Sequence, residues 1–289
     1  MEGYDASATA AGGSWAGKPL SFPLIQGADC CGRIVAVGDG VDGARIGDRV
    51  LVRPMQSRPG VDGDRVTFTF GSECNGGFAE YTIAAADDAV KVNSELSDVE
   101  LASFPCAFST AEGMIQRSCL NAEKVLITGA SGGVGSAAIQ LAMRRGAHVT
   151  ALTSAAKAAD LRALGADETI DRDAPLPAAA FDVVLDLVGG PRWPDLIDSL
   201  RDRGRYVTSG AIAGPIVELD LRTLYLRDLT LIGSTYQPTT VFTDLVRYIE
   251  KGEIRPLLAA TYPLEQLRAA QEKFLAKSHI GKIGITVPG

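Results

Sequence analysis

At 289 residues, the chain is long enough for one large domain or two moderate ones, each with its own core. The net charge of -7 and the lack of a basic block exclude nucleic-acid binding as its main function. No apolar run is long enough to span a bilayer, and no signal peptide opens the chain. The five cysteines show no framework spacing, so a cytoplasmic protein is expected.

The first part of the chain has the pattern of a β-rich region. Its first 19 residues are rich in Gly, Ala and Ser, which is typical of a flexible segment or a surface loop. From Ile25 to about Val92, short apolar runs are separated by glycine-containing turns. The segments GRIVAVG, DRVLVRP and GGFAEYTIAA are predicted strands, and the region is predicted to be barrel-like.

From Glu95 onward the pattern changes to helices and buried strands. The stretch SDVELASFPCAFSTAEGMIQRS has helical spacing, with Ser97 and Glu100 forming a predicted capping box. Then KVLITG, HVTALT, FDVVLDLVG, RYVTSG and LTLIGS are predicted buried strands, with GSAAIQLAMRRG and AAKAADLRALG as predicted helices. Repeated strand–helix–strand order predicts a parallel, doubly wound sheet. The tail after Ile254 reads as strand, helix, strand, and could return to the first region.

A glycine-rich turn lies between one strand and the next helix. Compared with G-x-G-x-x-G, residues 130–135 have Ala130 at the first position and Gly132 and Gly135 at the other two. Gly132 would let the backbone approach a pyrophosphate, and Gly135 would let the helix pack closely on the sheet. The loop amides and the positive helix end would face the anion, so dinucleotide binding is favoured over a purely structural turn. The predicted contacts in this loop are Ser131, Gly132, Gly133 and Val134.

The end of the second strand predicts which dinucleotide binds. An NAD site usually has an acidic residue about 20 residues after the glycine loop. This chain has Leu152-Thr153-Ser154 there, followed by Lys157, with Arg172 after the next strand region. Hydroxyls and cations suit a 2′-phosphate, so NADPH is favoured over NADH. The alternative is that Thr153 and Ser154 only cap a helix and that Lys157 is solvated.

Together these motifs resemble the medium-chain dehydrogenase/reductase superfamily, specifically its zinc-free quinone oxidoreductase-like branch. The resemblance rests on GADCCGRIVAVGDGV, IGDRVLV and GGFAEYT, and continues through SFPCAFSTA, GASGGVGSAAIQLA, LRALGAD, DLVGG, LIGS and HIGKIGI. It implies an α/β fold, with a Rossmann-type doubly wound parallel sheet at residues 109–253. Residues 1–108 and 254–289 would form a partial GroES-like β-rich domain. Family members begin some dozens of residues earlier, so this catalytic domain is expected to be N-terminally incomplete.

The resemblance also bears on whether the adjacent cysteines bind metal. Metal ligands, a redox pair and small hydrophobic residues are the alternatives for Cys30 and Cys31. Zinc-dependent members carry a His-Glu pair where this chain has Ala28-Asp29, and Cys106 alone falls near a catalytic ligand position. Because zinc needs three or four ligands, no metal site is predicted. Cys30 and Cys31 are interpreted as core residues of a strand.

Without zinc, the expected reaction is hydride transfer from NADPH to a quinone or an α,β-unsaturated carbonyl. No catalytic acid is assigned, because His148 and His279 are interpreted as structural and Tyr81 as core. The alternatives are an NADPH-binding protein without turnover, acting as a redox sensor or structural protein, and a zinc alcohol dehydrogenase. By resemblance the remaining cofactor contacts would be Thr110, Val188, Gly189, Ser209, Gly210, Ala211, Gly233, Ser234 and Lys282. Each of these could instead have a structural or solvated role.

The last predicted strand bears on assembly. An apolar strand at the edge of a doubly wound sheet invites pairing with another chain. In the family that is resembled, this strand pairs with its symmetry mate. A homodimer joined through residues 229–235 is therefore expected, and a strand covered by the chain's own loops is the alternative.

Overall fold

The computed structural model describes residues 22–59 and 65–288, so the segment at residues 1–19 lies outside it. The chain divides into two compact units, one of residues up to Cys106 and from Phe242, the other Ala107–Val241. Helices α3 (Pro105–Arg117) and α8 (Thr239–Glu250) cross the two boundaries. The predicted division placed the second boundary later, at residue 254. Whether the two units fold as separate domains stays a prediction.

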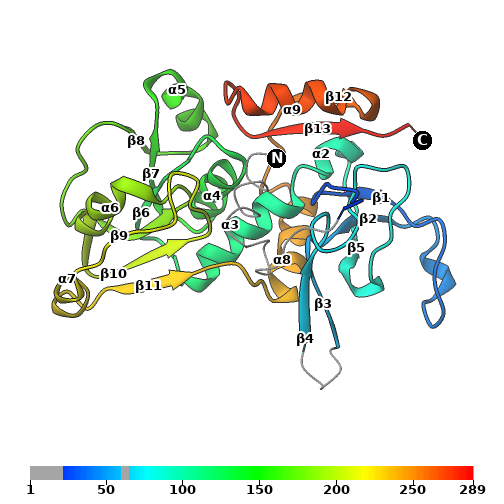
Figure 1. Ribbon diagram of the computed structural model, residues 1–289, viewed down its shortest axis with the longest axis horizontal. Coiled ribbons are helices and arrows are strands. Elements are labelled where there is room, and N and C mark those ends of the chain that lie inside the picture. The colour runs from blue at the N-terminus through cyan, green and yellow to red at the C-terminus, as the bar shows by residue number, and fades with distance from the viewer. Residues whose placement is uncertain (1–21, 60–64, 289) are drawn as a thin grey trace. The chain divides into compact units, whose positions relative to one another are not determined.

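The second unit contains one parallel sheet of six strands in the order β11-β10-β9-β6-β7-β8 (Figure 1). From β6 the chain winds outward through β7 and β8, then returns to β9 and continues through β10 to β11 at the other edge. This confirms the predicted doubly wound sheet. The elements are β6 (Lys124–Ile127), α4 (Gly133–Arg144), β7 (His148–Thr153), α5 (Ala155–Leu164), β8 (Glu168–Asp171), β9 (Phe181–Asp186), η3 (Gly190–Arg192), α6 (Trp193–Ser199), β10 (Leu200–Thr208), α7 (Leu221–Leu226) and β11 (Thr230–Gly233).

Continuous apolar runs form the central strands because both faces of this sheet are covered. Leu126 of β6 and Val184 of β9 are fully buried in a core cluster that α6 completes. In that cluster Trp193 packs edge-to-face on Tyr206, with ring centroids 4.7 Å apart. Burying one large apolar side chain contributes about 1.5–3 kcal/mol, so these residues fix how α6 lies on the sheet.

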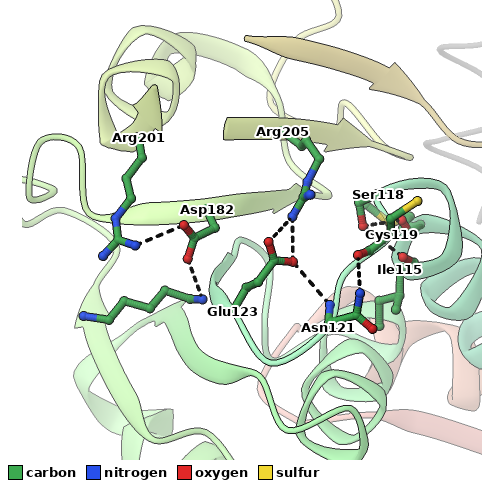
Figure 2. Close-up of polar contacts among 10 residues, drawn as sticks. Ile115, Ser118, Cys119, Asn121, Glu123, Asp182, Arg201 and Arg205 are labelled. Carbon is green, nitrogen blue, oxygen red and sulfur yellow. Dashed lines mark hydrogen bonds and ion pairs between the residues drawn. The ribbon is translucent and has the colours of Figure 1, made fainter. Parts of the chain in front are cut away.

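The amino-terminal edge of the sheet is tied together by charges (Figure 2). Asp182 accepts the amide of Lys124 at 2.9 Å and a guanidinium hydrogen bond from Arg201 at 3.0 Å. Arg205 donates to both carboxylate oxygens of Glu123, at 2.7 and 2.6 Å. These contacts join β6, β9 and β10 where the strands begin. In open α/β sheets ligands bind at the opposite, carboxyl edge, so we assign this network to stability.

The first unit is built from small sheets, two short helices and most of α8. Its antiparallel sheet has the order β1-β2-β5, β3 and β4 form a hairpin, and β12 and β13 form a parallel pair. The elements are β1 (Cys31–Arg33), η1 (Gly43–Arg45), β2 (Arg49–Val52), β3 (Met55–Pro59), β4 (Arg65–Thr69), η2 (Ala86–Asp88), β5 (Ala89–Lys91), α2 (Asp98–Leu101), β12 (Leu258–Pro263), η4 (Leu264–Gln266), α9 (Leu267–Leu275) and β13 (Lys282–Thr286).

Two predicted strands of the first unit differ from the structure. Only Gly32 and Arg33 of GRIVAVG lie in a strand, β1, and GGFAEYTIAA forms no strand in the described chain. The prediction that Tyr81 is a core residue was wrong, because 74% of its surface is exposed, and Ile83 is 90% exposed. The amides of Gly76 and Phe78, at the start of the predicted strand, bond instead to the carbonyls of Ile25 and Gln26, a segment that forms no strand.

The predicted helix after Glu95 is present in two pieces. The Glu100 carboxylate accepts the Ser97 amide at 2.8 Å, so the predicted capping box begins α2. The helix then breaks, and α3 restarts at Pro105, a residue suited to a first helical position because its ring presets φ. The tail is strand, helix, strand as predicted, and it returns to the first region through an ion pair between Lys282 and Asp29.

Candidate cofactor site

The glycine loop follows β6 and leads into α4. Gly132 is the N-cap of α4 and Ser136 begins its hydrogen bonding, with an amide-to-carbonyl distance of 2.9 Å to Gly132. A Cβ added at Gly135 would lie 2.3 Å from the carbonyl oxygen of Gly129, so only glycine fits there. The close packing predicted for Gly135 is therefore present. The first-turn amides of a helix point outward without intrahelical partners and attract anions.

One residue of this loop was missed by the comparison with G-x-G-x-x-G. Gly129 has a φ of 57° and turns the chain out of β6, whereas Ala130, at the position of the first motif glycine, is fully buried. A left-handed conformation disfavours other residues, so Gly129 serves as the turn glycine. The signal was in the sequence, because Gly129 directly precedes the motif.

The loops after β9 and β10 pack beside the glycine loop. A Cβ on Gly129 would lie 3.2 Å from the Val188 side chain, and the carbonyl of Val188 accepts the amide of Ala213 at 2.9 Å. A Cβ on Gly189 would lie 3.1 Å from the Cα of Ala211. The structure thus brings together three predicted groups of contacts at the carboxyl edge of one sheet: the glycine loop, Val188 with Gly189, and the segment 209–211.

Asp186 organises this edge, and the sequence alone did not single it out. Its side chain is fully buried at the end of β9, and four donors point at the carboxylate. These are the hydroxyls of Thr128 and Tyr206 and the amides of Val188 and Gly189, the amides lying at 3.0 and 3.1 Å. Burial, and then the charge of Asp186, raise the pKa of Tyr206, which therefore stays a donor. The carboxylate fixes the backbone of the loop after β9.

Two cationic side chains, those of Lys157 and Arg172, follow the ends of β7 and β8. The Lys157 ammonium lies 3.5 Å from the hydroxyl of Ser131 in the glycine loop. The amide of Arg172 bonds to the carbonyl of Thr153 at 2.8 Å, which places Arg172 beside the end of β7. Burial, and then the positive charge of Arg172, lower the pKa of Lys157 below its ordinary value. The predicted residues Ser131, Thr153, Lys157 and Arg172 therefore form one electropositive group.

Ser154 is at the N-cap of α5, as the capping alternative expected. Within the described residues, however, its side chain makes no capping hydrogen bond. The Asp171 carboxylate instead accepts the amide of Ala155, the first residue of α5, at 3.1 Å. The Ser154 hydroxyl is therefore not committed to the helix end.

Thr110, Gly233 and Ser234 come from α3 and the end of β11. The Gln237 amide nitrogen lies 3.5 Å from the Thr110 hydroxyl. A Cβ added at Gly113 on α3 would lie 3.3 Å from Gln237 and 3.8 Å from the Ser234 hydroxyl. Thr110 and Ser234 are thus on neighbouring elements, while an added Cβ at Gly233 would meet open space.

Lys282 belongs to the first unit, where it forms a polar cluster with Asp29 and Cys106. The Asp29 carboxylate accepts the Lys282 ammonium at 2.6 Å and the Cys106 amide at 2.7 Å. Burial alone would lower the pKa of Lys282, but the nearby Asp29 carboxylate holds it above its ordinary value. Burial, and then the charge of Asp29, raise the pKa of the Cys106 thiol to about 11. Cys106 is therefore a neutral thiol here.

The other cysteines and the histidines have local roles. Cys30 and Cys31 are half-buried rather than core residues as predicted, and only Cys31 lies in β1. Burial raises the thiol pKa of Cys30 to about 11 and that of Cys31 to about 12. His148 starts β7 at the amino edge of the sheet, 3.3 Å from Glu168, and the ring of His279 packs against Phe274. In the part of the chain that the structure describes, no three Cys, His, Asp or Glu residues are grouped to hold a metal ion.

The chain matches two family models and several known enzymes. Residues 2–94 match the family described as alcohol dehydrogenase GroES-like domain, and residues 164–284 that described as zinc-binding dehydrogenase. Acryloyl-coenzyme A reductase of Metallosphaera sedula is 30% identical over 283 residues, covering 92% of this chain and 84% of the relative. The chloroplast envelope quinone oxidoreductase homolog of Arabidopsis thaliana is 27% identical, covering 92% of this chain and 80% of the relative.

The chain belongs to the medium-chain dehydrogenase/reductase superfamily and is quinone oxidoreductase-like. This confirms the resemblance found in the sequence, and the protein is an oxidoreductase of that family. Among solved structures, a 2-octenoyl-CoA carboxylase reductase, CinF, in complex with NADP and 2-octenoyl-CoA has a TM-score of 0.84 and 27% identity. That match covers 99% of this chain and 73% of the other. In the described part of this dehydrogenase/reductase, helices are too short or too polar to cross a membrane.

Proposed function

We propose that this protein transfers hydride from NADPH to a quinone or an α,β-unsaturated carbonyl and does so without zinc. The observation that carries the cofactor choice is the electropositive group formed by Ser131, Lys157 and Arg172 at the end of β7. A 2′-phosphate would neutralise both cations, whereas the ribose of NAD carries no charge to pair with them. The structure of CinF in complex with NADP supports this choice. The quinone oxidoreductase homolog and acryloyl-coenzyme A reductase support the two classes of acceptor.

The glycine loop fits the cofactor. Gly132, the N-cap of α4, has no side chain, and the helix N-terminus would face the pyrophosphate. Val188 and Gly189 would contact the adenosine side, with segments 209–211 and 233–234 toward the nicotinamide. When bound, the nicotinamide supplies the hydride. The protein then contributes orientation of the acceptor and stabilisation of the oxyanion that forms, and no residue is assigned as proton donor.

The cofactor assignment is tested by Lys157→Ala. It is expected to weaken NADPH binding by about 1–3 kcal/mol, the range for losing a charge-assisted hydrogen bond, and barely to change NADH binding. Fluorescence titration of both cofactors measures this. Arg162→Ala removes the same charge from the far end of α5 and is the matched control. Equal losses for NADPH and NADH would contradict the phosphate assignment.

Turnover is tested by steady-state oxidation of NADPH with quinones and enones. Oxidation with either acceptor class supports the proposal. NADPH binding without oxidation would instead favour the non-catalytic alternative, a redox sensor or structural protein. The five cysteines, all free thiols, fit the cytoplasmic location that we also propose.

Zinc independence is supported by the cluster of Asp29, Cys106 and Lys282. Zinc binds the thiolate form of cysteine, and here the Cys106 thiol is held neutral and the neighbouring carboxylate is already paired with an ammonium. Purified protein is expected to contain no stoichiometric zinc, and chelators should leave it folded and active. Elemental analysis before and after chelation measures this. Stoichiometric zinc that is lost together with activity would overturn the proposal and favour a zinc alcohol dehydrogenase.

We also propose a homodimer joined along β11. β11 is an edge strand of the six-stranded sheet, and Leu231 and Ile232 are only half-buried rather than fully buried as predicted. The amide of Ser234 bonds to Thr208 of β10 at 2.9 Å. The N–H and C=O groups of successive residues in a strand point to opposite sides. Because the amide of Ser234 points toward β10, the amide and carbonyl of Leu231 point away from β10, to the free edge of the sheet. The neighbouring helix α7 adds exposed apolar residues, namely Leu221, Tyr225 and Leu226.

Leu231→Pro is expected to give a monomer, because it removes a donor from the free edge without removing a bond to β10. Light scattering at micromolar concentration measures the mass, and Leu231→Val, which keeps the donor, is the control. A monomeric mass for the intact, folded protein would rule the dimer out. A dimeric Leu231→Pro variant would place the interface elsewhere.

A further inference from the structure

The turn after β8 is held in place from two sides. It runs from Asp171 to Ala174, closed by the Ala174 amide on the Asp171 carbonyl at 3.0 Å. On one side the Asp171 carboxylate accepts the amides of Asp173 at 3.0 Å and of Ala155, at the start of α5, at 3.1 Å. The turn is therefore tied to the same helix end that carries Lys157.

On the other side the turn is held by Arg192, a residue that belongs to none of the predicted contacts. Arg192 ends η3, directly after the loop of Val188 and Gly189. Its two terminal nitrogens donate to the carbonyls of Arg172 and Ala174, the second at 3.1 Å. Its third nitrogen is 3.0 Å from the carboxylate of Asp195, which anchors the guanidinium to α6. The planar fork of arginine suits two carbonyls on one turn, and a lysine could serve only one of them well.

This anchoring matters because Arg172 and Lys157 repel each other. Their mutual effect is visible in the lowered pKa of Lys157, to which the charge of Arg172 contributes after burial. The Arg172 side chain is exposed, with 68% of its surface accessible, and its Nε lies 3.9 Å from the Asp173 carboxylate on the same turn, so the position of the guanidinium depends on how this turn is held. Fixing the backbone at both carbonyls keeps the guanidinium within reach of a phosphate that bridges the two cations.

We infer that Arg192 is a positioning residue for cofactor choice. Its hydrogen bonds hold the turn at residues 171–174, and this keeps the Arg172 guanidinium where it recognises the 2′-phosphate of NADPH. This rests on the proposed use of NADPH. Arg192 itself acts only through Arg172, so its removal affects the phosphorylated cofactor selectively. It also links the loop on the adenosine side to the phosphate-binding turn, because η3 follows that loop immediately.

The test is Arg192→Met, with dissociation constants for NADPH and NADH measured by fluorescence titration. NADPH binding is expected to weaken about five- to tenfold, part of the effect of losing a charge-assisted bond, while NADH binding stays within about twofold. Arg201→Met is the matched control, since it also removes an arginine paired with one aspartate, but at the amino edge of the same sheet. It should leave both constants unchanged. An equal loss for both cofactors would show a purely structural role and overturn the inference.

Two further variants separate positioning from charge. Arg192→Lys keeps the positive charge but loses the planar guanidinium that donates to two carbonyls, so it should still weaken NADPH binding selectively. Full NADPH affinity in this variant would overturn the positioning role. In a double-mutant cycle, Arg192→Met should add nothing to Arg172→Ala. An additional selective loss there would mean that Arg192 does not act through Arg172. If Lys157→Ala and Arg172→Ala leave NADPH binding intact, the proposed cofactor fails and the inference falls with it, an outcome distinct from a failure of Arg192 alone.

Discussion

Asp186→Asn is expected to lower the melting temperature by about 6–12 °C, the shift that a loss of roughly 3 kcal/mol produces in a chain of this size. The carboxylate accepts four hydrogen bonds in a fully buried position. An asparagine offers one oxygen and one amino group, so whichever way it turns, at least two donors face an N–H group. Each buried donor left without an acceptor costs about 1–3 kcal/mol.

The same substitution should weaken NADPH and NADH binding together. The amides of Val188 and Gly189 take their positions from the Asp186 carboxylate, and the proposed adenosine contacts lie at these two residues. Differential scanning calorimetry gives the stability, and titration of the folded variant gives the affinities. Asp182→Asn, at the other end of the same strand and more exposed, is the control and should cost less than about 1 kcal/mol. Equal melting temperatures for the two variants would show that the buried carboxylate is not the organising group.

The role of Asp186 could not be predicted from the sequence. An aspartate after an apolar run looks like the first residue of a loop, and the motif DLVGG draws attention to the residues after it. Two of its donors, Thr128 and Tyr206, are 58 and 20 positions away in the chain. They meet Asp186 because β6, β9 and β10 are neighbours that end at the same edge. Only the strand order reveals such a cluster, although the strands themselves were predicted correctly.

The parts of the fold that were predicted correctly depend on local signals. Buried parallel strands need continuous apolar runs, and helices α4 and α5 are followed by Gly146 and Gly165, both with positive φ. The strands of the first unit have no comparable local signal in the sequence, because a strand forms only where a partner strand pairs with it. GGFAEYTIAA has suitable residues, yet in the described chain it finds no partner strand, and Tyr81 and Ile83 are exposed. Arg192 was missed for a similar reason, since its two carbonyl partners are 20 and 18 positions away.

The second large effect is expected for Gly135→Ala. The added methyl group would lie 2.3 Å from the carbonyl oxygen of Gly129 and 2.6 Å from the Cα of Ala130. Both are backbone atoms of the glycine loop, so no side chain can move aside, and either α4 or the loop must shift. Overpacking of this kind costs about 1–3 kcal/mol. The loop is the less supported of the two, because α4 is packed against the sheet along most of its length.

The shift should therefore appear as a loss of cofactor affinity, roughly tenfold or more for NADPH and NADH alike, since the glycine loop is proposed to bind the pyrophosphate common to both. This separates Gly135→Ala from Lys157→Ala, which should affect NADPH alone. Gly38→Ala, where an added Cβ meets open space, is the control and should change neither affinity. Titrations are made well below the melting temperature of the variant, so that unfolding does not contribute. Unchanged affinity for both cofactors in folded Gly135→Ala would mean that the loop before α4 does not bind the dinucleotide, and the cofactor proposal would fail with it.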